Sequence, residues 1–306
     1  MTKNIGFLSD IHIDSWVSNL DPKSNKFKKQ LNDFFKLINF TPKFINDNNI
    51  ETLIIAGDIG HYNAQIKGVL LEFKKLVKNL IITFGNHEMY LLSNQMQEQF
   101  KRDSINRLKD IEDFCIENDI IYLNGQMITI NNIKIMGTGM HWDGSIGKKI
   151  EPDISEYTTI RRWLDYMNDG LYIHQDGKRN YKTLPCYGTR YELFSNFQPL
   201  EFFKKEYSKL FKYNKEDNID IIVTHYPPIM EKEETLHHYD NYYCFDGTGV
   251  IDELQPKYWI HGHIHKPMDI MYNDCNILSN PIGYKSEFKK GSNREIKILY
   301  LKDTNG

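Results

Sequence analysis

The sequence predicts an α/β fold, because short apolar runs of strand length alternate with stretches whose apolar residues recur at helical spacing. Strands are expected in the first part of the chain at 5–8, 52–56, 80–84 and 120–123. Helices are expected between them at 27–38, 66–77 and 103–118, where apolar residues line one face. A fold that mixes both element types in this order has a sheet at its centre.

The pattern changes after the first half of the α/β alternation. Residues 128–135 alternate apolar and polar around Asn131-Asn132, which predicts a β-hairpin. The next stretch, 142–199, is polar and aromatic with weak periodicity, so we expect an insertion or cap rather than a part of the core sheet. A helix at 202–211 and strands at 219–223 and 258–260 follow. Without a visible linker, we expect one domain over 1–306 that carries this insertion.

Composition limits the class of protein. The chain has 306 residues, 40% of them apolar, and a formal net charge of -3, which does not favour nucleic acid or an anionic membrane as a partner. No apolar run reaches the roughly 20 residues that cross a bilayer, and no secretory signal is visible. The cysteines are far apart, and we expect free thiols in a cytoplasmic protein: Cys115, Cys186, Cys244 and Cys275.

Polar clusters follow five of the predicted strands. Each cluster lies just past the carboxyl end of its strand, where ligand sites form in α/β sheets. The clusters are Asp10-Ile11-His12, Gly57-Asp58, Gly85-Asn86-His87-Glu88, Thr224-His225 and Gly262-His263-Ile264-His265. One such motif carries little weight, but five in this order are not explained by chance.

The residue types in these clusters indicate a metal centre. Carboxylate, imidazole and amide groups are ligands for Mn, Fe or Zn, and the absence of cysteine argues against a structural zinc site. There are enough ligands for two ions, and Asp58 is the natural bridge between them. Two divalent metal ions about 3.5–4 Å apart can clamp a phosphoryl group and generate hydroxide. The sequence therefore predicts two ions, with Mn or Fe favoured and Zn possible.

The ordered set resembles the calcineurin-like metallophosphoesterase superfamily. The closing segments Trp259–His265 and Ser279–Tyr284 are similar to a branch of small bacterial phosphohydrolases. This resemblance implies two mixed β-sheets packed face to face, with helices on the outer faces. It implies that Asp10, His12, Asp58 and His265 hold one ion and that Asp58, Asn86, His225 and His263 hold the other.

The resemblance also implies a reaction. His87 is not a ligand in the family pattern and would act beside the leaving group as a general acid or charge stabiliser, with Asp58 the other catalytic residue. Tyr226 departs from the pattern, because that branch often has a second His there. The expected function is hydrolysis of a phosphate mono- or diester, in a small or nucleotide-like substrate, by a metal-bound hydroxide. The second hypothesis is a nuclease that acts on DNA or RNA, and the third is a non-catalytic scaffold.

Other polar and aromatic residues have no motif spacing. We expect structural or surface roles for the remaining histidines, with His141 the best candidate to border the site; they are His61, His141, His174, His237, His238 and His261. We expect the aromatic group Tyr242, Tyr243 and Phe245 to pack rather than to stack on a nucleobase. The pairs Lys148-Lys149 and Arg161-Arg162 are expected to face solvent.

Overall fold

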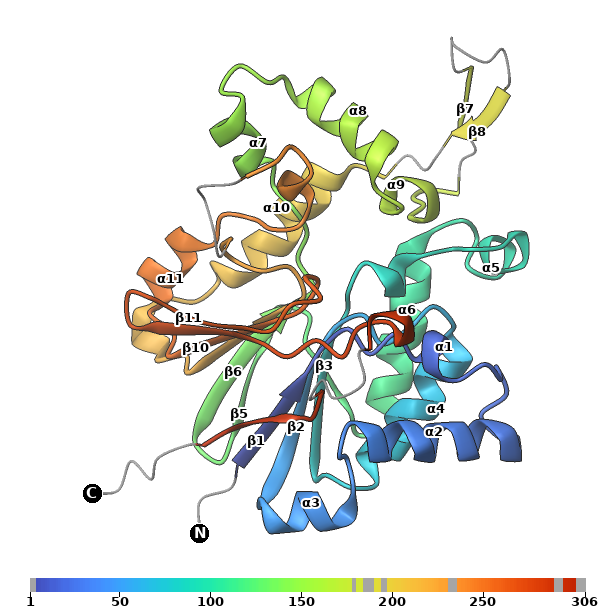
Figure 1. Cartoon of the computed structure of the whole chain (residues 1–306). Helices are drawn as coiled ribbons and strands as arrows, with labels where there is room; N and C mark the ends of the chain where they lie inside the picture. Colours follow the sequence, from blue (N-terminus) through green and yellow to red (C-terminus); the bar gives the residue numbers. More distant parts are fainter. Residues whose placement is uncertain are drawn as a thin grey trace.

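The computed structural model describes residues 4–177, 180–183, 190–193, 197–230, 236–288 and 294–300. Two mixed β-sheets lie at its centre, with helices on the outer side of each (Figure 1). The predicted fold class is therefore confirmed. Among the described residues, the structure contains no helix long and apolar enough to cross a membrane.

The first sheet has five strands in the order β13-β1-β2-β3-β4. Its strands are β1 (Asn4–Leu8), β2 (Ile50–Ala56), β3 (Asn79–Thr83), β4 (Ile121–Tyr122) and β13 (Lys297–Leu299). The strands β1 to β4 are parallel, and β13 pairs antiparallel with β1. Parallel pairing places the carboxyl ends of β1, β2 and β3 at one edge of the sheet.

The second sheet has six strands in the order β11-β12-β10-β9-β6-β5. Its strands are β5 (Met127–Ile130), β6 (Ile133–Thr138), β9 (Ile221–Thr224), β10 (Tyr258–His261), β11 (Met268–Tyr272) and β12 (Cys275–Ser279). The hairpin β5–β6 turns at Asn131 and Asn132, whose φ angles of 50° and 65° suit a tight turn of the primed type. The predicted hairpin is confirmed, and it forms the edge of this sheet.

Alternate residues of the strands build two apolar layers. Ile5, Phe7 and Ile54 of the first sheet pack with Ile221 and Val223 of the second, which fills the space between the sheets. Residues of the opposite parity, such as Leu8 and Leu53, join a larger cluster with the helices. The strands are apolar on both faces because both faces are covered.

Helices cover the outer faces of both sheets. Around the first sheet they are α1 (Ile13–Trp16), α2 (Asn25–Leu37), α3 (Pro42–Asp47), α4 (Asn63–Lys74), α5 (Asn94–Gln99) and α6 (Ser104–Glu117). Near the second sheet they are α10 (Pro199–Leu210) and α11 (Thr248–Leu254). The start of α6 follows from its sequence, since the Asp103 carboxylate accepts a hydrogen bond from the Ile105 N–H as the N-cap.

The insertion, 142–199, stands above the two sheets (Figure 1). It contains α7 (Ser145–Ile150), α8 (Glu156–Tyr166), α9 (Asp169–Tyr172) and a separate hairpin of β7 (Asn180–Thr183) and β8 (Arg190–Leu193). Its residues 178–179, 184–189 and 194–196 lie outside the described residues. Neither β7 nor β8 joins a core sheet, and the helices of this segment were not predicted individually.

The cysteines follow the prediction where the structure describes them. Cys115, Cys244 and Cys275 are buried free thiols, and Cys186 lies outside the described residues.

Candidate metal centre

The candidate ligands lie on loops at the carboxyl ends of neighbouring strands. Asp10 follows β1, Asp58 follows β2 and Asn86 follows β3, and these strands are parallel neighbours in the first sheet. His225 and His263 follow β9 and β10, which are parallel neighbours in the second sheet. The two sets of loops meet, because side chains from both sheets come within ligand distance of one another.

Several of these residues have an unusual backbone conformation. The φ angle is 50° at Asp10, 43° at His12, 53° at Asp58 and 68° at His263. Positive φ is uncommon for residues other than glycine and concentrates at functional sites, where surrounding structure holds it in place. Here it turns each loop sharply after its strand.

Glycine is required where two of these loops touch. A Cβ atom at Gly85 would lie 2.1 Å from Oδ1 of Asp58, and one at Gly57 would lie 2.6 Å from Nδ1 of His225. Gly57 also has a φ of 80°. Any larger residue would push the Asp58 carboxylate or the His225 imidazole out of place, so the glycines in Gly57-Asp58 and Gly85-Asn86 allow the loops to approach closely.

One cluster joins Asp10, His12 and His265. The two Nε2 atoms of His12 and His265 are 3.0 Å apart, and Nε2 of His265 is 3.7 Å from Oδ1 of Asp10. Oδ2 of Asp58 lies 3.8 Å from Nε2 of His12. The four residues predicted for the first ion are therefore brought together, with His12 and Asp10 fully buried.

A second cluster joins Asp58, His225 and His263. Nε2 of His225 is 3.3 Å from Oδ2 of Asp58 and 3.1 Å from Oδ1 of Asn86. Nε2 of His263 is buried and has no hydrogen-bond partner among the described residues. Since Oδ2 of Asp58 faces His12 on one side and His225 on the other, this one carboxylate lies between the two clusters.

The outer hydrogen bonds of these imidazoles fit a metal site. Nδ1 of His225 is 2.9 Å from the carbonyl of Ala56, and Nδ1 of His265 is 2.8 Å from the Glu287 carboxylate. When Nδ1 donates to these oxygens, Nε2 keeps a lone pair directed at the centre, as in metal-bound histidines. The unpartnered Nε2 of His263 has the same need for a Lewis acid. The residues present therefore fit a pair of divalent ions.

The pKa shifts of Asp58 and His225 also suit a site that binds cations. Burial opposes ionisation of Asp58, but His225 and His87 beside it hold the pKa of this carboxyl well below its usual value. Burial likewise opposes a charged His225, but Asp58 outweighs this and raises the pKa of His225 to about 9. Asp58 is therefore held as a carboxylate, the form in which it can bind a metal ion.

His87 lies beside the clusters rather than within the predicted ligand set. Its backbone N–H donates to Oδ1 of Asp58 at 2.9 Å, and its Nε2 is 3.8 Å from Oδ2 of Asp58. Its Nδ1 is 2.5 Å from Nε2 of His61, and Nδ1 of His61 is 2.9 Å from Oδ2 of Asp14. His87 also comes within ligand distance of His12 and Asp58. A measurement of the metal bound by a His87 variant therefore distinguishes a ligand role from an acid role.

His61 is a residue whose place the sequence did not predict. We expected a structural or surface role, but the structure stacks its ring on that of His87, with centroids 4.6 Å apart. The available signal was its position in the same loop, three residues after Asp58.

Glu88 fixes two of the loops. Its carboxylate is buried and accepts hydrogen bonds from four backbone N–H groups: Asp58 at 2.9 Å, Ile59 at 2.8 Å, Gly60 at 3.0 Å and Gly85 at 2.7 Å. Burial nevertheless raises the pKa of Glu88 to about 7. The last residue of the Gly85–Glu88 motif thus ties the loop after β2 to the loop after β3.

Asp169 connects the insertion to the candidate ligands. Its Oδ1 accepts hydrogen bonds from Nδ2 of Asn86 at 2.7 Å and from the Tyr90 hydroxyl at 2.5 Å, and its Oδ2 accepts from the Tyr226 hydroxyl at 3.2 Å. Because Nδ2 of Asn86 is held in this way, its Oδ1 points toward His225. No sequence motif marks Asp169, and it lies in the insertion that the sequence left without a match.

The remaining expectations have mixed outcomes. Tyr242 and Phe245 are buried packing residues, as expected, whereas Tyr243 faces the pocket. His141 is buried with its Nε2 3.9 Å from Oδ2 of Asp169, so it borders the site from behind. His261 is buried within β10, and its Nε2 lies 3.4 Å from the sulfur of Met268.

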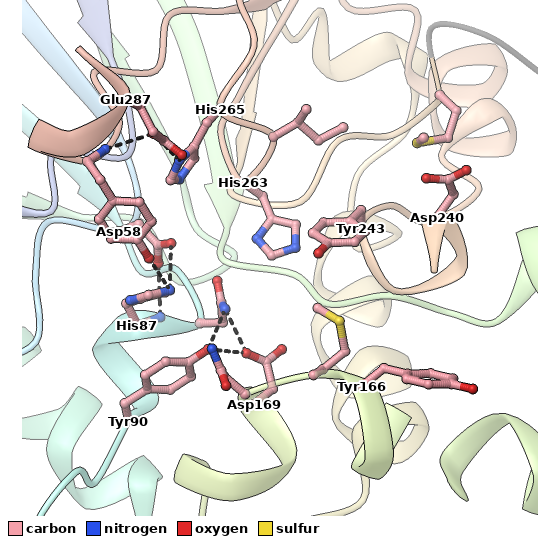
Figure 2. A pocket seen from close by; sticks show the side chains of 16 residues that line it. Asp58, His87, Tyr90, Tyr166, Asp169, Asp240, Tyr243, His263, His265 and Glu287 are labelled. Carbon is pink, nitrogen blue, oxygen red and sulfur yellow. Dashed lines mark hydrogen bonds and ion pairs between the residues drawn. The ribbon is translucent and has the colours of Figure 1, made fainter. Parts of the chain in front are cut away.

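A cavity of about 500 Å³ opens onto the metal centre. Figure 2 shows His87, His263 and His265 along one wall, with Tyr166, Asp240 and Tyr243 along another. Tyr166 and Asp169 come from the insertion, so this segment forms part of the cavity lining, with Asp169 beside the candidate ligand Asn86. The arrangement is a half-open cavity with a cluster of candidate metal-ligating groups on one side.

The family profile of calcineurin-like phosphoesterases matches residues 3–267. The chain belongs to this family. A protein named uncharacterized protein L509, from Acanthamoeba polyphaga mimivirus, is 23% identical over 295 residues, which cover 92% of this chain and 91% of that protein. The crystal structure of phosphopantetheinyl hydrolase from Mycobacterium tuberculosis has a TM-score of 0.68 and 13% identity, and the likeness covers 99% of this chain and 98% of that one. This second likeness is one of fold.

Proposed function

We propose that this protein hydrolyses a phosphate ester with two divalent metal ions. Asp10, His12, Asp58 and His265 would hold the first ion, and Asp58, Asn86, His225 and His263 the second. The observation that carries this proposal is the place of the Asp58 carboxylate, which faces both clusters through Oδ2. A single ion needs no such shared carboxylate, whereas a pair of ions does.

When bound, two such ions supply charge neutralisation on the phosphoryl group and a water made nucleophilic at neutral pH. Mn or Fe suits the mixed nitrogen and oxygen ligands best, and Zn is the other candidate. The chain itself keeps the ligand loops in a fixed geometry. Glu88 holds the two loops that carry Asp58 and Asn86, and the close packing around Gly85 keeps their geometry fixed.

His87 is placed to protonate the leaving group. Burial raises the pKa of the Asp14 carboxyl, but the hydrogen bond with His61 and the attraction to it together outweigh burial and lower this pKa. Donation of a hydrogen bond from Nε2 of His61 to Nδ1 of His87 would leave the proton of a neutral His87 on Nε2. Burial lowers the pKa of His87 well below its usual value, which agrees with a neutral ring. His87 lines the cavity, so this proton would face a bound ester. As it passes to the leaving oxygen, the proton on Nε2 of His61 would move to Nδ1 of His87, so His87 stays a neutral imidazole.

The pocket favours a small substrate over a nucleic acid. A cavity of about 500 Å³ suits a nucleotide-sized molecule, and its described lining contains no Lys or Arg to follow a phosphate backbone. The solved structure of similar fold is named for hydrolysis of a phosphopantetheinyl group, so a phosphopantetheinyl ester belongs in the test alongside nucleotides. We further propose that the insertion is a cap that selects the substrate, because its residues line the cavity.

The test is a measurement of metal content and turnover on the same preparation. We expect two ions per chain and hydrolysis of a small mono- or diester that stops on chelation and returns when metal is restored. At a free-ion concentration about 100 times the Kd, each site should add about 2.7 kcal/mol to the free energy of unfolding, which a thermal melt with and without chelator detects. Full activity in protein stripped of metal would overturn the proposal.

The alternatives give different results in the same panel. A nuclease would degrade single- or double-stranded DNA or RNA faster than p-nitrophenyl esters and nucleotides. A scaffold would bind metal without turning over any ester. The complete set of converging ligand side chains favours an enzyme over a scaffold.

A further inference from the structure

The cavity has two walls of different chemistry. The metal wall is made by the imidazoles and carboxylates already described. The far wall is made by Tyr166, Met167, Met230, Asp240 and Tyr243, from the insertion and from the loop after β9. A phosphoryl group bound at the metal wall would direct the rest of the substrate toward the far wall, so the far wall determines which ester fits.

The far wall offers aromatic and thioether surface. Tyr243 lies between His263 and Asp240 (Figure 2), and its ring is 5.4 Å from the ring of His263 with an interplanar angle of 37°. The Tyr243 hydroxyl stays protonated, because burial and the nearby carboxylates of Asp169 and Asp240 raise its pKa. The methionines add flexible, polarisable groups that adapt to a flat ligand. Such a surface binds a planar organic group by stacking and dispersion.

The described lining of the cavity carries acidic groups and no Lys or Arg. Its carboxylates are Asp58, Asp169, Asp240 and Glu287. Three of them are already compensated by neighbours: Asp58 by the metal centre, Glu287 by His265 at 2.8 Å, and Asp169 by its three hydrogen-bond donors. Asp240 differs, because its described hydrogen bond comes from the His237 backbone N–H at 2.6 Å, and no described ion pair involves it.

An anionic group on the far side of a substrate would therefore meet Asp240 without a Lys or Arg in the described lining to offset it. Like charges repel strongly in a partly enclosed cavity, where screening by water and salt is reduced. A second phosphate or carboxylate would be disfavoured there, whereas a neutral aromatic group would be accepted. The amino group of a nucleobase could donate a hydrogen bond to the same carboxylate.

We propose that the far wall selects esters of a flat aromatic or heteroaromatic group that carries no second anionic group. This inference rests on the proposed phosphoesterase function, since it assumes that the phosphoryl group lies at the metal wall. It excludes polyphosphates, bisphosphates and oligonucleotides as preferred substrates. It assigns Tyr243 and Asp240 as specificity-determining residues.

The test uses phosphonates, which occupy the site without being hydrolysed. Benzylphosphonate, 4-carboxybenzylphosphonate and ethylphosphonate are titrated calorimetrically into the metal-loaded protein. We expect the wild-type protein to bind benzylphosphonate about tenfold more tightly than its carboxylated analogue, because of Asp240. In Asp240→Lys this ratio should reverse. In Tyr243→Leu the preference for benzyl over ethyl should fall about fivefold.

A matched control removes the effect of overall charge. Asp113 is exposed on α6, and Asp113→Lys changes the net charge as much as Asp240→Lys does, so it should leave the ratio as in the wild type. Thermal melts of all variants check folding. Equal affinity of the wild type for the two benzyl compounds, or an unchanged ratio in Asp240→Lys, would overturn the inference.

Turnover assays separate the two proposals. Metal-loaded protein that shows this selectivity but hydrolyses no ester would refute the proposed function and leave the selectivity standing. Protein that hydrolyses esters without discriminating between neutral and anionic groups would refute the selectivity alone.

Discussion

The metal wall and the insertion differ in how the chain builds them. The metal wall consists of short loops that follow parallel strands, and most of its side chains are buried, with His87 and His265 partly exposed. Among its described residues, the insertion lines the site with one short segment, 166–169, at the junction of α8 and α9. Strand register alone can fix the positions of reactive side chains, whereas the positions of side chains on the insertion depend on how this separate segment packs. Variants on the two sides should therefore have effects of different size and kind.

The largest effect is expected at the shared carboxylate. Asp58→Asn keeps the size of the side chain but removes the charge that faces both clusters, so both ions should be lost and activity should fall to background. Elemental analysis and turnover are measured on the same sample. Retention of two tightly bound ions together with activity would contradict the assignment of Asp58 as the bridge.

The next effect is expected at His87 and depends on the leaving group. His87→Asn should keep both ions and lose about 10²–10⁴-fold in turnover of an alkyl ester, because the departing alkoxide needs a proton. The loss with p-nitrophenyl phosphate should be much smaller, since p-nitrophenolate leaves without one. Equal losses with both substrates would exclude the acid role, and loss of an ion would indicate a ligand role.

A smaller effect is expected where the insertion touches the metal wall. Asp169→Ala removes the acceptor that orients the Asn86 amide, and loss of such an outer partner weakens metal affinity or activity about 10–100-fold. The effect should fall on the second ion and leave the first in place, as metal titration can show. Asp169→Asn is the matched control, because its amide oxygen can still accept from Asn86 and Tyr90.

This contact also bears on the design of experiments with the insertion. As a cap, 142–199 should change substrate preference when it is shortened, with both ions retained. A deletion of the whole segment, however, would remove Asp169 together with Tyr166 and Met167 of the far wall. Single substitutions therefore separate metal binding from selectivity more cleanly than a deletion.

The smallest effect is expected on the outer surface of the insertion. Arg162 pairs with Glu151 at 2.8 Å on a solvent-exposed face, and exposed ion pairs contribute little. Arg162→Ala should change kcat/KM less than about threefold and leave metal content unaltered. A larger loss would mean that this face of α8 contacts substrate, which would extend the selective surface beyond the cavity.

The sequence predicted the metal wall better than the far wall for a physical reason. Asp10, Asp58 and Asn86 lie at fixed offsets from apolar strands, and strand register carries those offsets directly into space. The two-sheet arrangement came from family resemblance, because apolar runs alone do not reveal which strands share a sheet.

No comparable rule of spacing identifies the site residues that the sequence did not predict. Asp169 acts on Asn86 across a large separation in sequence, through the packing of α8 and α9, and its own neighbours carry no motif. His61 was closer to prediction, since it lies in the loop of Asp58, but a lone histidine does not indicate its partner. The pairing of Glu287 with His265 depends likewise on the path of the chain after β12.

The order of the candidate ligands along the chain has a consequence for biogenesis. A ribosome delivers Asp10, His12, Asp58 and Asn86 early, together with the parallel strands that position them. It delivers His225, His263 and His265 only later, and β13, which pairs with β1 at the edge of the first sheet, follows all of them. A nascent chain would thus first present carboxylate and amide oxygens, which are ligands that hard cations such as Mg²⁺ prefer. In the proposed centre the three late imidazoles complete the ligand set, so the metal available to the finished chain, rather than the one met during translation, would determine what the chain carries.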